Sequence, residues 1–287
     1  FSLDDIKRAV LNLHSISKHL RLNRQRNGCL SLNQVKLNFV LEKESGLPYG
    51  YYVYKQKDSN KLVEEFMLLA NIAVANRIYE HFPNKAILRR HPMPNTKQLE
   101  QLADSLKESG FDCDITGSNT IQAFLNSVEK TDLLSSIALT CLLTKTMQLA
   151  QYFCSGVAKD KDFFYHYGLA VPLYTHFTSP IRRYPDILVH RLLAASLGYC
   201  QLTGREAPLL QAISENCNEK KYSARICSER SSELFFAIFV NVSEKEKNVH
   251  IKFLKPEVKF KNLFFFLTGN RTVRGDRMRH SNKRPFI

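Results

Sequence analysis

The residues best suited to chemistry lie between positions 174 and 186. Thr178 and Ser179 precede a proline there, which is typical of a helix start. A helix start offers unpaired backbone N–H groups that suit an anion. Arg182 and Arg183 follow, and their guanidinium forks fit a phosphate. The backbone N–H groups of the helix start and the two arginines could therefore hold a phosphate group.

Aromatic side chains alternate with these polar residues. Tyr174, His176, Phe177 and Tyr184 supply ring faces on which unpaired bases could stack. Phosphate-binding groups interleaved with rings are what a single-stranded nucleic-acid site requires. The same residues also fit a structural alternative, in which hydroxyls cap a helix, arginines are solvated and rings fill the core.

Paired carboxylates form a second candidate. Glu64 and Glu65 lie in an otherwise apolar helix, where charges are costly unless they are paired. They could contact arginines, a sugar hydroxyl or the surroundings of a metal, or make a structural ion pair.

Asp186 and His190 are four residues apart on one predicted helix, a spacing that suits two metal ligands but more often a structural hydrogen bond. A basic cluster at residues 89–91 could contact a nucleic-acid backbone or lie in a solvated loop.

These candidates need a framework of helices with a few strands. Apolar periodicity and turn residues predict both kinds of element. Helices are expected at residues 3–22, 61–82, 96–109, 131–152 and 180–198 (turn, then helix), and at 207–238 with a break. Strands are expected at residues 29–32, 36–41, 51–54 and 166–174. The sequence therefore predicts an α+β fold with antiparallel strands.

Composition limits the class of protein. The 287 residues are 44% hydrophobic, enough for a sizeable core, and the longest apolar cluster near the end is far shorter than the ~18 residues of a membrane span. Seven cysteines without a C-x-x-C pair argue against a zinc site and a disulfide framework, and favour a reducing compartment. The net charge of +14 favours a polyanionic partner. More than half of that excess lies in residues 241–287, so the rest of the chain is only weakly basic.

The run from residue 174 to residue 191 resembles the signature of the RNase II (RNB) family of 3′-to-5′ exoribonucleases. His-Phe-Thr-Ser-Pro-Ile-Arg-Arg-Tyr, followed by an Asp and by His-Arg-Leu, is a long and specific match. The likeness covers roughly residues 1–240, and several segments are most similar to a eukaryotic branch of the family. Those segments include residues 62–71, 88–92, 152–156, 166–170 and 234–237.

This resemblance implies an activity and residue roles. Such enzymes thread single-stranded RNA into a channel, hydrolyse its last phosphodiester with Mg²⁺ and release nucleoside 5′-monophosphates. Arg182 would be catalytic, contacting the scissile phosphate, and Arg183 would be the second basic contact. Glu64, with Glu65 beside it, would lie near the terminal nucleotide, and Glu229 matches a further acid near the 3′ end. The implied partner is single-stranded RNA, including 3′-uridylated RNA, for a cytoplasmic monomer that acts outside any larger complex and at no membrane.

The sequence also departs from the family pattern. The Asp-rich motif that holds Mg²⁺ in the family has no match, so we expect its ligands upstream of Phe1 and no metal site within the chain. Leu32 stands where bacterial relatives stack the last base on a Phe. We expect a partial RNB catalytic domain at residues 1–240, and at residues 241–287 a divergent basic tail in place of an S1-type barrel. The chain itself is expected to be inactive; an RNA-binding pseudoenzyme or regulatory fragment, and an unstable truncated product, are the alternatives.

Overall fold

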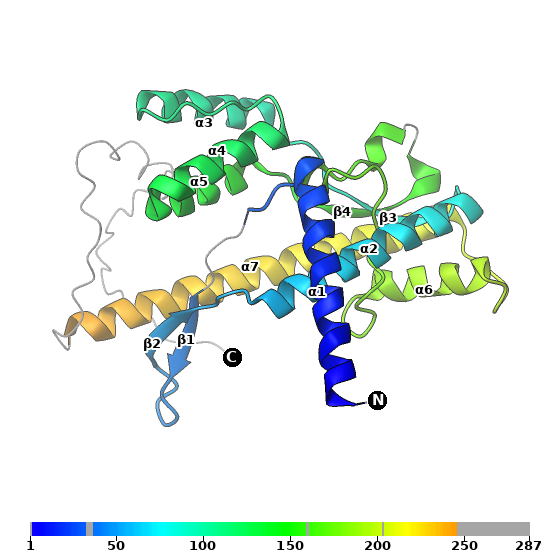
Figure 1. Cartoon of the computed structure of the whole chain (residues 1–287), viewed down its shortest axis with the longest axis horizontal. Coiled ribbons are helices and arrows are strands. Elements are labelled where there is room, and N and C mark those ends of the chain that lie inside the picture. Colours follow the sequence, from blue (N-terminus) through cyan, green and yellow to red (C-terminus); the bar gives the residue numbers. More distant parts are fainter. Residues whose placement is uncertain (1, 33–36, 159–160, 203, 246–287) are drawn as a thin grey trace, which may run out of the picture. The chain divides into compact units, whose positions relative to one another are not determined.

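The computed structural model describes residues 2–32, 37–158, 161–202 and 204–245. They belong to the first of two units, residues 1–251 (Figure 1). Most of them are helical and the strands are short and antiparallel, so the predicted α+β fold is confirmed. Most of the predicted basic tail lies outside the described residues.

Two long helices lead into the domain. α1 spans Leu3–Arg26 and α2 spans Asp58–His81, and the two pack together. The Ser2 hydroxyl accepts a hydrogen bond from the Asp5 backbone N–H at 3.2 Å, and the Asp5 carboxylate accepts one from the Ser2 N–H at 3.1 Å. This reciprocal capping satisfies two of the donors that a helix start leaves free.

The strands form two antiparallel pairs, one between neighbouring strands and one between strands far apart in the sequence. β1 (Leu37–Leu41) pairs with β2 (Pro48–Val53), and β3 (Ile87–Arg90) pairs with β4 (Gln151–Cys154). α7, at Ala207–Lys245, contacts both β2 and β4, so one long helix spans the two small sheets (Figure 1).

The core lies where α2, β3, β4 and α6 (Tyr184–Ser196) meet. Its buried residues include Val74, Ala75, Ile78, Ile87, Leu88, Phe153, Cys154, Leu188, Val189, Leu192 and Leu210. α3 (Thr96–Glu108) and α4 (Ser118–Thr131) pack against α5 (Leu133–Thr146) as a separate group. Short 3₁₀ turns at Ser155–Val157, Lys161–Phe164 and Tyr167–Leu169 connect β4 to the loop before α6.

Several predicted elements were wrong in type or extent. The helix expected at 131–152 ends at Thr146, where threonine hydroxyls donate to carbonyls of the preceding turn, and residues 151–154 pair instead with β3. The strand expected at 166–174 is a 3₁₀ turn with isolated bridges, because Ala170 adopts a left-handed φ of 53°.

Other predictions missed an element or divided one. Residues 29–32 form no strand, and α4 was not predicted. α7 runs without the expected break, because no Gly or Pro interrupts it after Pro208. Among the described residues, no helix is long and apolar enough to cross a membrane.

Candidate nucleic-acid interface

The stretch from Tyr174 to Arg183 is an irregular loop held along β3. The Tyr174 carbonyl accepts a hydrogen bond from the Arg89 backbone N–H at 2.8 Å. The Thr175 hydroxyl is fully buried and donates to the Ile87 carbonyl at 2.7 Å. The first half of the loop is therefore fixed to the core of the domain.

Asn71 of α2 supports the same loop from beneath. It is 3% exposed, its amide nitrogen donates to the Tyr174 hydroxyl at 3.0 Å, and its amide oxygen accepts from the Phe177 backbone N–H at 2.8 Å. Both hydrogen-bonding functions of the side chain are thus used in positioning the loop. Sequence reasoning gave Asn71 no role, although an amide within the apolar stretch of a helix is the kind of signal that could have identified it.

The second half of the loop is a turn anchored by Asp186. This carboxylate is fully buried in the first turn of α6, and its Oδ2 accepts from the Ser179 N–H and from Arg183 Nη2, each at 2.8 Å. The N–H groups of Arg182 and Arg183 donate to the Ser179 carbonyl. The turn and helix expected at 180–198 are confirmed, with α6 beginning at Tyr184. The helix-start signal read from Thr178 and Ser179 was wrong, because Asp186 accepts the Ser179 N–H in the turn before the helix.

His190 is also engaged in supporting the loop. Its Nε2 lies 2.8 Å from the Phe177 carbonyl, and its ring stacks on Phe177 with centroids 4.2 Å apart. Asp186 and His190 thus make separate structural contacts, as the hydrogen-bond alternative predicted, and do not converge on a shared point.

Cations gather behind the turn. Arg89 is 7% exposed and lies with its guanidinium carbon 4.8 Å from the centre of the Tyr152 ring. Burial, and after it the neighbouring arginine charges, lower the pKa of Lys221 to about 8, although the residue keeps an exposed surface. Three enclosed polar atoms here, the donors Arg89 Nη1 and Arg183 Nε and the acceptor Asp186 Oδ1, have no hydrogen-bond partner among the described residues. Arg89, Arg183 and Lys221 thus bring three positive charges together, and Asp186 neutralises that of Arg183.

Neutral histidines line the same region. The Tyr152 hydroxyl lies 2.6 Å from His176 Nδ1, and the His166 and His176 rings both meet the ring of Tyr174. Burial, together with nearby charges, lowers the pKa of His166 to about 3 and of His176 to about 2. Both rings therefore stay uncharged at neutral pH and add no positive charge to the cluster.

The tip of the turn faces solvent. Ile181 is 96% exposed, Arg182 is exposed, and Tyr184 is 45% exposed, while Thr178 is half-buried. Tyr174 is instead 4% exposed, so it supports the loop and offers little ring surface to a base. The predicted base and phosphate contacts of these residues stay predictions.

The paired glutamates lie at the α1–α2 interface. Glu65 is 3% exposed and receives hydrogen bonds from Arg24 at 2.6 and 3.2 Å, with Arg21 at 3.8 Å. Glu64 is more exposed, 3.5 Å from Arg21, and accepts from Gln56 at 3.1 Å. Both therefore make the ion pairs considered as a structural alternative.

Glu229 lies on α7, far in sequence from Glu64 and Glu65, and it pairs with a different arginine. It is exposed and accepts a hydrogen bond from Arg225 at 2.6 Å, four residues earlier on the helix. Such exposed pairs contribute little to stability. A role near an RNA 3′ end stays a prediction.

The carboxylates near the interface do not fit a Mg²⁺ site. In the described part of the chain, no three His, Cys, Asp or Glu side chains come together as metal ligands. Asp186 and Glu65 are each neutralised by an arginine at hydrogen-bonding distance. Mg²⁺ requires near-octahedral oxygen ligands, which these residues do not supply.

Comparison with known proteins gives consistent relatives. The chain is 50% identical over 242 residues to DIS3-like exonuclease 2 of Xenopus tropicalis, covering 83% of this chain and 29% of that protein. It is 46% identical over 201 residues to an inactive exonuclease, DIS3L2, of Arabidopsis thaliana, covering 69% of this chain and 19% of that protein. The chain thus spans less than a third of the length of these relatives.

Fold comparison agrees. The structure matches RNase R of Mycoplasma genitalium, solved in complex with ribose-methylated single-stranded RNA, with a TM-score of 0.70 over 83% of this chain and 37% of that one, at 24% identity. Residues 2–199 match the RNB domain. The predicted family and its eukaryotic branch are confirmed, and the chain belongs to the RNB domain family.

Proposed function

We propose that the loop at residues 174–186 grips the phosphates at the 3′ end of single-stranded RNA, within the catalytic domain of a 3′-to-5′ exoribonuclease that releases nucleoside 5′-monophosphates. The observation that carries this proposal is the cluster of Arg89, Arg183 and Lys221, in which two enclosed N–H donors lack partners. Buried charged donors normally have acceptors, and phosphate oxygens are strong ones.

Each part of the loop has a role in this proposal. Arg182, exposed at the tip, contacts the scissile phosphate and stabilises the charge that develops on it, while Arg183 is the second contact. Asp186 holds Arg183 in position and fixes the turn. Tyr184 follows Arg183 and is 45% exposed, so its ring is available for a base to stack on. His176 is half-buried and would offer only the part of its ring that Tyr152 and Tyr174 leave uncovered.

The Mg²⁺ expected of such an enzyme would polarise the phosphate and activate water, but the described residues do not fit it. We therefore propose that this chain alone cleaves no RNA. The test is incubation of the purified chain with 3′-labelled single-stranded RNA and Mg²⁺, followed by separation of the products. Mg²⁺-dependent release of mononucleotides would refute the proposed inactivity.

Binding is tested separately by fluorescence anisotropy with the same RNA. We expect affinity to fall steeply with salt, because phosphate contacts release counterions. Arg182→Ala and Arg183→Ala should each weaken binding by about tenfold, since each removes a charge-assisted contact. Arg8→Ala, on the exposed face of α1, is the matched control and should leave affinity unchanged. Equal affinity in all three variants would contradict the proposed interface.

A second candidate is an RNA-binding pseudoenzyme or regulatory fragment. The similarity to a relative named as inactive favours it. Both candidates predict RNA binding, so they differ only in cleavage by the protein of full length. A full-length protein that binds RNA 3′ ends in a salt-dependent way and still releases no nucleotides would select the pseudoenzyme. In either case we propose a cytoplasmic monomer, with uridine-tailed RNA as the substrate to test first.

A further inference from the structure

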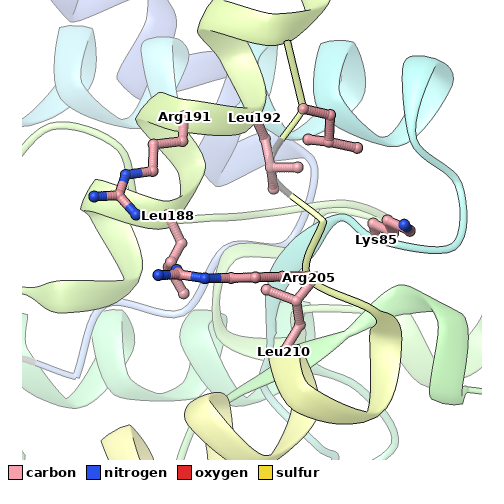
Figure 2. Close-up of a pocket in the computed structure, with 7 residues that line it drawn as sticks. Lys85, Leu188, Arg191, Leu192, Arg205 and Leu210 are labelled. Atoms are coloured by element: carbon pink, nitrogen blue, oxygen red, sulfur yellow. The ribbon is translucent and has the colours of Figure 1, made fainter.

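A pocket lies between α6, the start of α7 and the loop that precedes β3. Leucine side chains from α6 and α7 give it an apolar lining. Arg191 of α6 and Arg205 of the loop before α7 also line it, as does Lys85. Figure 2 shows the guanidinium groups of Arg191 and Arg205 on the same side of the pocket, with the Lys85 ammonium on the opposite side.

The charges of the pocket do not balance. Lys85 Nζ lies 2.8 Å from Glu206 Oε1, so these two groups neutralise each other. The ion pairs found in the described part of the chain give neither Arg191 nor Arg205 a carboxylate partner. The pocket therefore carries a net charge of about +2, located on the two guanidinium groups.

Arg205 shows that this charge lacks an acceptor. Its Nη1 is enclosed and makes no hydrogen bond to any described residue. An enclosed charged donor without an acceptor is costly, and such groups in native proteins usually have a partner such as an ion or water. Arg191 is exposed, so its side chain is free to close on a ligand beside Arg205.

We propose that this pocket binds the dianionic phosphate of a small phosphate monoester. A monoester carries a charge of about −1.5 to −2 near pH 7, which is close to the charge of the two arginines. An internal phosphodiester carries one negative charge and is flanked by two sugars, so it is poorly suited to reach the enclosed Nη1. The enclosed space is small, about 20 Å³, so the phosphate would sit at the arginines while the organic part of the ligand lies at the open mouth of the pocket. Neither arginine belongs to the RNA interface, so this inference goes beyond the proposed function and does not depend on it.

The experiment is calorimetric titration of the whole chain with uridine 5′-monophosphate, ribose 5-phosphate, inorganic phosphate and sulfate. We expect a saturable site that prefers the two monoesters. Arg205→Gln and Arg191→Gln should each raise Kd by about tenfold, because each removes one charge-assisted contact. The matched control is Arg8→Gln, whose partner Asp5 is exposed, and it should leave Kd unchanged.

Several outcomes would overturn the proposal. One is no saturable binding, and another is binding that Arg205→Gln and Arg191→Gln leave intact. Equal affinity for sulfate, inorganic phosphate and the monoesters would reject a monoester site. If an end-blocked oligonucleotide binds as tightly as its 5′-phosphorylated form, the pocket does not recognise a terminal monoester and is instead part of a surface that binds polyanions. If Arg205→Gln fails to fold, the exposed Arg191 still gives a decisive result.

Discussion

Glu65→Gln tests whether the paired glutamates serve the fold. The Glu65 carboxylate is 3% exposed, and the Arg24 side chain it binds is 16% exposed. Removing one partner of a buried ion pair leaves the other uncompensated and costs about 3–5 kcal/mol. In a unit of this size, each kcal/mol shifts Tm by about 2–4 °C, so we expect Tm to fall by about 6–20 °C. Glu64→Gln, which removes a more exposed contact, should cost at most about 1 kcal/mol.

The assay is thermal unfolding followed by circular dichroism, with urea denaturation as a second measure of the free energy of unfolding. Glu65→Leu should also destabilise the fold, because it leaves the Arg24 charge buried without a partner. Adding Arg24→Met to Glu65→Leu should recover much of that loss of stability, because an apolar pair leaves neither residue charged. The reasoning fails if Glu65→Gln and Glu64→Gln shift Tm equally and by less than about 4 °C. RNA affinity measured on the same variants would then decide whether Glu65 serves binding.

Three further predictions concern the interface. Lowering the pH below about 6.5 should destabilise the fold by at most about 1.4 kcal/mol per pH unit for each of His166 and His176, because their pKa values lie below those of histidine in the unfolded chain. Urea denaturation at several pH values measures how the free energy of unfolding depends on pH, and an unchanged pH dependence in His176→Phe would count against this prediction. Raising the pH through about 8 should weaken RNA binding as Lys221 loses its charge, an effect that anisotropy should find missing in Lys221→Gln. Asp186→Asn should cost about 3 kcal/mol or more by leaving Arg183 unpaired, and a loss under about 1 kcal/mol in thermal unfolding would show that the turn does not need this charge.

The sequence predicted elements whose local signals agree with their tertiary contacts. α1, α2, α3 and α6 appear near their expected positions because their runs of apolar and helix-forming residues agree with the contacts they make, and side chains of Ser2 and Asn95 also cap α1 and α3. β3 and β4 were missed because each has only four residues and is stabilised by the other across the chain. Residues 151–154 follow an apolar helix, and only pairing with β3 makes them a strand.

The interface shows the same division between local and long-range information. Arg182 and Arg183 were identifiable because they share one short run with the hydroxyls and rings around them. Arg89 was recognised only as part of a basic cluster, since nothing local shows that β3 buries its guanidinium beside Tyr152.

Lys221 was missed for a related reason. It follows Lys220 on an exposed stretch of a long helix, where charged residues are ordinary, and only the packing of α7 against β4 brings it near Arg89 and Arg183. The local run can thus name the residues that would touch a phosphate, but the positive charge of the site depends on cations from separate elements. Loss of Lys221 or Arg89 should therefore weaken phosphate binding while leaving the turn at Asp186 intact, because that turn is held by its own hydrogen bonds.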